Sequence, residues 1–307
     1  MLSYDDIKQK ADKSRISLVI DNEYSIYYIV LPKDNNTFDY KFATQFHECL
    51  DQIESDNLRY REEQSKFYEM ELILAKNNNN ETDSITESGK QIHKQQQQRS
   101  QTNLQNDKQL RIVKDKPAVM ITLGLGTKIF STGFNLDAIK KFEARIELPL
   151  IMQQLLARLL IFPMPTACLF NGHTIAGGLI FGLCHDFRIM REDKAFIQLS
   201  ELNIGLGFMP GYAAVVKHQL NAEMMRLLIF GKRYKSQQAL KMGVVQKLFK
   251  DEDDMINWAQ IFGKKYSHLG ENREAMKETK MNIHWQVHSI LTSFNELNQD
   301  TLNSIKL

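Results

Sequence analysis

The sequence has little of what would commit it to a metal centre, a disulfide scaffold, a membrane or a nucleic acid. Its three cysteines, Cys49, Cys168 and Cys184, show neither zinc-ligand nor disulfide spacing. No apolar run approaches the roughly 20 residues of a membrane span. With 39 Lys and Arg against 37 Asp and Glu, the net charge of +2 offers no broad basic field for nucleic acid. We therefore expect a soluble intracellular protein whose cysteines stay reduced.

The two ends of the sequence bear on its location in the cell. Residues 1–18 have no apolar segment like that of a secretory leader, and the early acids Asp5 and Asp6 are unlike a transit peptide. The last three residues, Ile305-Lys306-Leu307, share Lys-Leu with the peroxisomal signal Ser-Lys-Leu, although Ile305 stands where a small residue is usual. We expect a peroxisomal location, with a mitochondrial or cytoplasmic one as the alternative.

Residues 56–114 differ in composition from the rest of the chain. The first part, 57–76, is charged and helix-prone, and the second contains Asn77–Asn80 and Gln95–Gln98 with almost no large apolar residues. Such a composition cannot bury enough apolar surface to offset the entropy of ordering. We predict a low-complexity insert that is disordered or extended. It is either an expansion of a surface loop or an arm that docks on a partner in a larger assembly.

Hydrophobic patterns on both sides of the insert predict regular structure. Residues 16–20 and 24–31 are β-rich runs around a polar turn, which predicts a hairpin. Apolar residues recur at helical spacing between 38 and 53. From 117 to 190, strand-like runs alternate with helical patterns, and this alternation predicts βαβ units in a mostly parallel sheet. Helical patterns continue from 212 to 297.

The stretch from Pro165 to Pro210 has two unusual features. Gly177-Gly178 lie early in a helical pattern, where each glycine costs about 1 kcal/mol relative to alanine. Either they let the helix pack closely on the sheet, or a bare backbone N–H there faces an oxygen that becomes negative. Glu201 is the single acid among apolar and neutral neighbours. Such an acid is commonly exposed, but burial would raise its pKa and suit it to proton transfer.

At these residues the chain resembles a known family. Residues 171–211, NGHTIAGGLIFGLCHDFRIMREDKAFIQLSELNIGLGFMPG, look like the enoyl-CoA hydratase/isomerase (crotonase) superfamily, and within it like Δ3,Δ2-enoyl-CoA isomerases of peroxisomal type. The runs 121–139, ITLGLGTKIFSTGFNLDAI, and 231–249, GKRYKSQQALKMGVVQKLF, resemble further motifs of the family in the same order. The ordered series is more specific than any one motif.

The resemblance implies an α/β fold, a crotonase-like spiral of ββα turns with a C-terminal helical region that forms trimers and closes the acyl pocket. It divides the chain into the hairpin and first helix of the core (1–55), the insert (56–114), the rest of the core with the active site (115–230) and the C-terminal helices (231–307). A homotrimer or a dimer of trimers is expected. No metal and no cofactor are expected, because the acyl-CoA substrate itself carries coenzyme A.

The resemblance also implies a set of site residues. In the family, the N–H of the residue after the glycine of the motif, here Phe134, forms half of an oxyanion hole, and the other half maps to Gly177. Such donors stabilise the enolate of a thioester, each by roughly 3 kcal/mol. The implied substrate-binding residues are Gly133, Gly178, Ile180, Lys33 and Thr37. The last two lie in a turn that covers the coenzyme A nucleotide in relatives, and a plain surface turn is the alternative.

The number of acids distinguishes between activities. Hydratases of this family use two glutamates, and the position of the first is occupied here by Ile180, whereas the second is Glu201. One carboxylate with one oxyanion hole suits moving a double bond from C3 to C2 better than adding water. We therefore expect isomerisation of 3-enoyl-CoA to 2-enoyl-CoA in fatty-acid β-oxidation.

Two alternatives to this activity remain open. One is a catalytically inactive crotonase-fold subunit that docks in a larger assembly through its insert, and the other is a different activity of the hydratase family. Intact Gly133, Gly177 and Glu201 favour the isomerase, whereas the insert favours the inactive subunit.

Overall fold

The computed structural model describes residues 2–32, 35–80, 113–126, 128–140 and 142–293. The chain divides into two compact units, the first made of residues 1–53 and 117–307 and the second of residues 54–116. Within the described helices, none is both long and apolar enough to cross a membrane.

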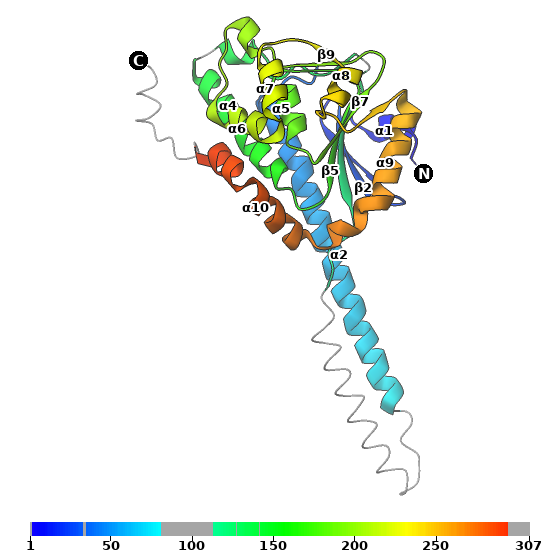
Figure 1. The fold of residues 1–307 in the computed structure, drawn as a ribbon. Helices are drawn as coiled ribbons and strands as arrows, with labels where there is room; N and C mark the ends of the chain where they lie inside the picture. Colours follow the sequence, from blue (N-terminus) through cyan, green and yellow to red (C-terminus); the bar gives the residue numbers. More distant parts are fainter. Residues whose placement is uncertain (1, 33–34, 81–112, 127, 141, 294–307) are drawn as a thin grey trace, which may run out of the picture. The chain divides into compact units, whose positions relative to one another are not determined.

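The larger sheet runs through the first unit (Figure 1). Its strands lie in the order β1-β2-β3-β5-β7-β10, and all neighbours are parallel except β1 and β2. These two form the predicted hairpin, with Ser17 opposite Val30 and Asp21 opposite Ile26. The strands are Ser17–Asp21 (β1), Ile26–Leu31 (β2), Val119–Gly124 (β3), Thr166–Phe170 (β5), Phe187–Arg191 (β7) and Lys247–Phe249 (β10).

The smaller sheet has the order β4-β6-β8-β9, in which β4, β6 and β8 are parallel and β9 is antiparallel to β8. Its strands are Ile129–Ser131 (β4), His173–Ile175 (β6), Phe196–Gln198 (β8) and Tyr234–Lys235 (β9). Successive strands alternate between the sheets, because β3, β5 and β7 of the larger sheet are followed by β4, β6 and β8 of the smaller one.

Each of these strand pairs leads into helical structure. The helical segments are Ala138–Lys140 (η1) and Phe142–Leu160 (α4) after β4, Gly177–Leu183 (α5) after β6, and Glu201–Ile204 (η2) and Pro210–Gln219 (α6) after β8. The repeated ββα turn confirms the α/β spiral that the sequence predicted.

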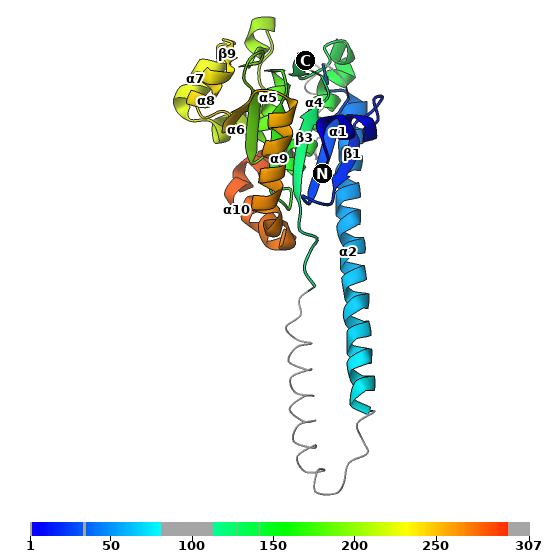
Figure 2. The ribbon, with the colours of Figure 1, turned by 90° about the vertical axis from the view of Figure 1, so that its right-hand side faces the viewer.

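Both faces of the larger sheet are buried, as is usual for parallel strands covered by helices. Alternate residues of β2 belong to two hydrophobic clusters: Tyr27 and Ile29 face one, while Tyr28 and Val30 face the other. Residues of α4, α5 and Tyr40–Asn80 (α2) complete the first cluster. Tyr4–Lys10 (α1) and Glu252–Tyr266 (α9) cover the opposite face (Figure 2).

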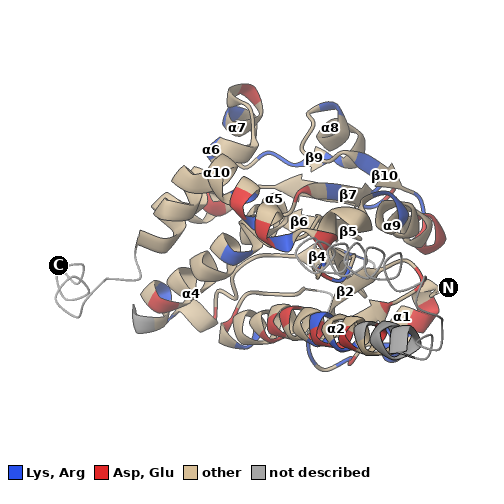
Figure 3. Cartoon of the chain, turned by 90° about the horizontal axis from the view of Figure 1, so that it is seen from below, with Lys and Arg blue, Asp and Glu red and all other residues tan. Residues whose placement is uncertain are grey.

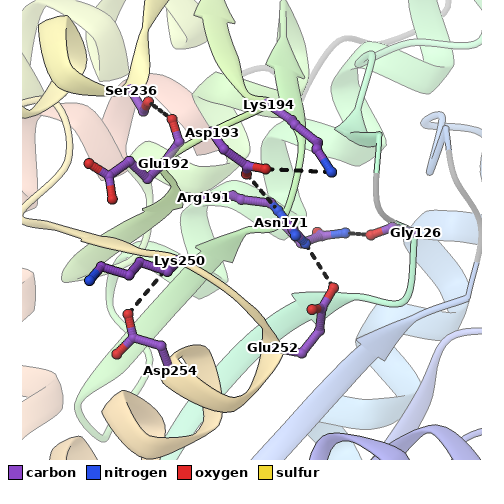
Figure 4. Close-up of polar contacts among 10 residues, drawn as sticks. All are labelled: Gly126, Asn171, Arg191, Glu192, Asp193, Lys194, Ser236, Lys250, Glu252 and Asp254. Atoms are coloured by element: carbon purple, nitrogen blue, oxygen red, sulfur yellow. Dashed lines mark hydrogen bonds and ion pairs between the residues drawn. The ribbon is translucent and has the colours of Figure 1, made fainter.

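A cluster of ion pairs fixes the end of β7 (Figure 4). Arg191 Nη1 donates to Glu252 Oε1 at 2.7 Å, and Arg191 Nε donates to Asp193 Oδ1 at 2.9 Å. Ser236, the first residue of Ser236–Lys241 (α8), donates its hydroxyl to the carbonyl of Glu192. The β7–β8 connection, which leads towards Glu201, is therefore held to both α8 and α9.

The remaining C-terminal helices are Ala222–Ile229 (α7), Ser267–Glu271 (η3) and Arg273–Thr292 (α10). Lys280 fastens α10, which lies against α4 and α6, to the start of the β5 strand. Its ammonium donates to Asp186 Oδ2 at 2.6 Å and to the carbonyl of Met164 at 2.8 Å. Asp186 also accepts from the N–H and the hydroxyl of Thr166, at 2.8 and 3.0 Å.

The first part of the insert corrects the prediction that all of 56–114 is disordered or extended. Helix α2 continues from the first unit as far as Asn80. The apolar face of residues 42–53 is buried, which stabilises the start of the helix. Extending the helix beyond these residues costs little free energy, because Glu, Gln, Lys, Arg and Leu favour helix. Charged residues of both signs lie along α2 (Figure 3). Residues 81–112, which include Gln95–Gln98, lie outside the described residues.

Side-chain bonds hold the second unit together. The Asn57 carboxamide donates to Asp115 Oδ1 at 2.9 Å and accepts from the N–H of Lys116 at 2.8 Å. The Lys116 ammonium in turn reaches Asp56 at 2.7 Å. The chain on its return to the core is thus bonded to α2.

Candidate active site

Three neighbouring strands bring the predicted site residues to one edge of the smaller sheet. β4, β6 and β8 are adjacent and parallel, so their carboxyl ends lie at the same edge. Gly133 and Phe134 follow β4, Gly177 follows β6, and Glu201 follows β8 within three residues. Ligands of α/β folds commonly bind at the carboxyl ends of parallel strands.

The segments after β4 and β6 approach each other so closely that they require glycine. Gly133 has φ +76°, and a Cβ there would lie 2.6 Å from the backbone nitrogen of Gly177. A Cβ on Gly177 would in turn lie 3.1 Å from the ring of Phe38 and 3.4 Å from the Cα of Gly133. Any side chain at position 133 would therefore crowd the Gly177 amide.

Two backbone donors on these segments are unused. In the described part of the chain, neither the N–H of Phe134 nor that of Gly177 donates a hydrogen bond. Ala176, immediately before Gly177, adopts φ 53° and ψ −130°, a strained conformation for a residue with a side chain. Its N–H is bonded to the carbonyl of Gln198 at 2.8 Å, which ties this turn to β8. The turn that leads to the Gly177 donor is thus hydrogen-bonded to β8.

The two interpretations of Gly177-Gly178 apply to different residues. A Cβ on Gly178 would lie 2.8 Å from both the Cβ and the carbonyl oxygen of Ser131, so Gly178 permits close packing of α5 on β4. Gly177 carries a free N–H and lies opposite Gly133. Ile180, one turn further along α5, is 1% exposed and belongs to the first hydrophobic cluster.

Glu201 opens η2 and is half-buried, with one carboxylate oxygen that is buried but not satisfied. Among the described residues, Glu201 Oε2 has no hydrogen-bond partner. Burial raises the pKa of Glu201 to about 7, and hydrogen bonds from its own N–H and that of Ser200 oppose this only in part. A carboxyl group with such a pKa can both take up and release a proton near neutral pH.

Aromatic rings surround the donor side of the site. The half-buried Phe134 ring meets Phe38 edge to face at 5.8 Å between centroids and Tyr212 at 5.9 Å. The Tyr212 hydroxyl donates to the carbonyl of Pro149 at 2.7 Å, and burial raises its pKa well above the ordinary value. Tyr212 is thus a neutral packing residue that supports the Phe134 ring.

The predicted nucleotide turn lies apart from these residues in sequence. Thr37 is half-buried and lines a small open hollow of about 50 Å³, together with Arg15, Asn36 and Lys41. Lys33 lies outside the described residues. In the described part of the chain, no three His, Cys, Asp or Glu side chains are grouped as metal ligands.

Two further residues, Ser131 and Asn36, are buried beside the Phe134 loop and were not among the residues predicted from the sequence. Asn36 has φ 33°, and asparagine is one of the few residues that tolerate a positive φ. The pair Asn35-Asn36 in a turn was the available signal. Nothing in the sequence indicates that this turn contacts residues almost a hundred positions later.

Comparison with known proteins agrees with the fold and the motifs. Residues 90–306 match the family model described as enoyl-CoA hydratase/isomerase. Enoyl-CoA delta isomerase 3 of Arabidopsis thaliana is 34% identical over 172 residues, which cover 53% of this chain and 68% of that protein. Enoyl-CoA delta isomerase 2, peroxisomal, of the same plant is 32% identical over 169 residues, 52% of this chain and 68% of that protein.

A solved structure extends the likeness to almost the whole fold. An enoyl-CoA isomerase of Mycobacterium tuberculosis superposes with a TM-score of 0.65 over 96% of this chain and 99% of its own, at 15% identity. At that identity the structural likeness supports the fold, and the match to the family model supports the membership. This chain belongs to the enoyl-CoA hydratase/isomerase family.

Proposed function

We propose that this protein isomerises 3-enoyl-CoA thioesters to 2-enoyl-CoA thioesters. The observation that carries the proposal is the placement of the Glu201 carboxylate, whose Oε2 is buried and has no hydrogen-bond partner among the described residues, at the same sheet edge as the unused backbone donors of Phe134 and Gly177. The naming of relatives as enoyl-CoA delta isomerases supports it.

In the proposed reaction, Glu201 takes a proton from C2 of the substrate. The electron pair of the broken C–H bond moves into a dienolate, and negative charge develops on the thioester oxygen. The N–H groups of Phe134 and Gly177 bind this oxygen, and each such donor is worth roughly 3 kcal/mol in the transition state. Glu201 then returns the proton at C4, so that atoms and charge balance with no further reactant.

The presence of one acidic side chain at the site, where hydration calls for two, favours isomerisation over hydration. Addition of water calls for a second acid or base that positions the water, and the corresponding place on α5 holds Ile180, which is buried and apolar. A single group whose pKa is near 7 suffices to carry one proton between two carbons.

Spectrophotometric assays of 3-enoyl-CoA isomerisation and 2-enoyl-CoA hydration by the purified protein test this proposal. We expect isomerisation with little hydration. Strong hydration would favour the hydratase alternative, and binding of CoA esters without either activity would favour the inactive subunit.

A pair of glycine variants tests the oxyanion hole. Gly133→Ala places a methyl group against the Gly177 amide and is expected to lower kcat by about 10²-fold or more. Gly243→Ala is the matched control, because Gly243 has a similar φ of +72° but a Cβ there would meet only Met224, at 3.6 Å. Both variants place a side chain at a similar positive φ. Equal activities would contradict the proposed oxyanion hole.

We also propose a cellular location and a metabolic role for this activity. Two relatives carry "peroxisomal" in their names, which supports a role in peroxisomal fatty-acid β-oxidation. A fluorescent fusion with a free C-terminus would then colocalise with a peroxisomal marker, and signal confined to mitochondria would contradict this.

Assembly into trimers is supported by exposed apolar side chains on the C-terminal helices. Ile283 and Trp285 of α10 are 61% and 59% exposed, and Ile261 of α9 is 50% exposed. Exposed apolar patches commonly mark association surfaces. Light scattering at micromolar concentration would give a trimer or a dimer of trimers, and a monomeric mass would contradict the proposal.

A further inference from the structure

A segment from the N-terminal part of the chain holds the loop that carries the Phe134 N–H. We call residues 131–135 the donor loop and residues 35–38 the backing segment. Three backbone hydrogen bonds join them: Thr132 N–H to Asn35 O at 3.1 Å, Phe38 N–H to Gly133 O at 2.7 Å, and Asn135 N–H to Phe38 O at 2.9 Å. The donor loop is therefore paired along most of its length.

The pairing leaves one donor free. The N–H groups of Thr132 and Asn135 are bonded to the backing segment, and that of Gly133 is bonded to the hydroxyl of Ser131 at 3.1 Å. Of the four consecutive N–H groups at 132–135, all in the described chain, that of Phe134 alone has no acceptor. The loop thus presents a single amide in a fixed direction.

Ser131 connects the three parts of this arrangement. Its side chain is fully buried, and its hydroxyl accepts from Gly133 N–H and donates to the carbonyl of Asn36 at 2.9 Å. The same hydroxyl lies against α5, since a Cβ on Gly178 would be 2.9 Å from it. One side chain therefore touches the donor loop, the backing segment and the helix that begins with Gly177.

Asn36 secures the other end of this connection. It is 4% exposed, and its Nδ2 donates to the carbonyl of Phe130 at 2.8 Å. Its positive φ turns its carbonyl towards Ser131, and a strained residue of this kind persists only where its surroundings hold it. Ser131 therefore bonds to the backing segment, and Asn36 of the backing segment bonds back to β4.

We propose that Ser131, backed by Asn36, is a positioning residue that sets the direction of the Phe134 N–H relative to that of Gly177. The inference rests on the proposed isomerase activity. Neither side chain touches the reacting atoms. Loss of the Ser131 hydroxyl removes its bonds to the Gly133 amide and the Asn36 carbonyl together. The donor loop then samples orientations in which Phe134 N–H no longer points at the enolate oxygen.

The first test is kinetic. Ser131→Ala is expected to lower kcat for 3-enoyl-CoA by about 10- to 100-fold with KM unchanged, because a displaced donor loses part of its transition-state contribution. Thr122→Val is the matched control: it removes another fully buried hydroxyl, which is bonded to His185 at 2.9 Å. It is expected to keep kcat. Equal kcat values for the two variants would overturn the proposal.

A second variant separates the side chain of Asn36 from its backbone. Asn36→Gly keeps the positive φ and the carbonyl that Ser131 uses, but removes the bond to Phe130. We expect a smaller loss of kcat than in Ser131→Ala and a non-additive double variant, because both changes loosen one loop. Additive losses would contradict a shared role.

Two readouts do not depend on turnover. Binding of acetoacetyl-CoA, whose enolate absorbs in the near ultraviolet, reports the strength of the oxyanion hole, and Ser131→Ala is expected to reduce the enolate fraction while Thr122→Val does not. Amide hydrogen exchange at Gly133 is expected to accelerate in Ser131→Ala alone. Wild-type protein with no isomerase activity would reject the proposed function. Active wild type with unchanged exchange and enolate fraction in Ser131→Ala would reject only the positioning role.

Discussion

Lys280 and Glu201 are two ionisable side chains of the first unit that are withdrawn from solvent, and their hydrogen-bonding surroundings differ. Lys280 is 7% exposed at its side chain and donates to both Asp186 and the Met164 carbonyl. Glu201, after β8, has a buried oxygen with no partner in the described structure. Burial lowers the pKa of Lys280, an effect that Asp186 opposes, whereas burial raises that of Glu201 to about 7 with little compensation.

The difference shows what each group is for. A buried charge that is bonded to an opposite charge and a carbonyl fixes geometry, and here it fastens α10 to the sheet. A carboxyl group with one buried oxygen that lacks a partner costs stability, and such groups are characteristic of proton-transfer sites. Under the proposed function, the Lys280 region contributes stability and the Glu201 region contributes chemistry, and three measurements test this contrast.

The largest expected effect is on turnover. Glu201→Gln keeps the shape of the side chain but cannot carry a proton, so we expect kcat to fall by about 10³-fold or more with CoA-ester binding nearly unchanged. Lys280→Met is the counterpart and is expected to keep kcat per folded molecule. Isomerisation that survives Glu201→Gln would place the base elsewhere.

The next effect is on stability. Lys280→Met leaves the Asp186 carboxylate without its cation, and we expect the free energy of unfolding to fall by about 3 kcal/mol in denaturant titrations. The double variant Lys280→Met, Asp186→Asn removes the unpaired charge and is expected to recover part of this loss. A double variant no more stable than the single one would show that the packing of Lys280, not its charge, matters.

The smallest effect depends on pH. Burial raises the pKa of Glu201 to about 7 in the folded protein, against an ordinary value of 4.5, so ionisation opposes folding. Below pH 4.5 the wild type bears no such cost, between 4.5 and 7 its stability falls relative to Glu201→Gln, and above 7 the difference is complete. The full difference between these pKa values corresponds to about 3 kcal/mol, and because Glu201 is only half-buried we expect Glu201→Gln to be more stable by on the order of 2 kcal/mol at pH 8. Thermal unfolding of both proteins at pH 4 and pH 8 measures this, and a constant difference would contradict the burial of an unpartnered carboxyl group.

Patterns within single segments were predictable from the sequence. The hairpin at 16–31 and the strand Thr166–Phe170 follow from short apolar runs between turn residues, and the structure contains both. The strands of the smaller sheet have only two or three residues each, too few to show an alternating pattern, so the second sheet could not be read from the sequence. The extent of α2 was also missed, because low apolar content argues against packing but not against extending a helix already begun.

The candidate site likewise has features that the sequence predicts and features that only the structure shows. The motifs around Gly133, Gly177 and Glu201 were visible in the sequence, and the structure brings all three to one sheet edge. That Gly177 offers a free N–H while Gly178 makes room for Ser131 depends on which atoms lie opposite each glycine. Such contacts join segments far apart in the chain, and residue types alone do not encode them.

The alternation of strands between two sheets has a consequence for how such a protein can change over evolutionary time. Each ββα turn contributes one functional group at its own strand end: an amide after β4, an amide after β6 and a carboxylate after β8. Mutations that alter one turn leave the framework of the others intact. In the proposed mechanism, the carboxylate can therefore be replaced, or an acid added on α5, while the two amides continue to bind the thioester oxygen. On that mechanism, single substitutions give access to new reactions of CoA esters without an intermediate form that no longer binds the substrate.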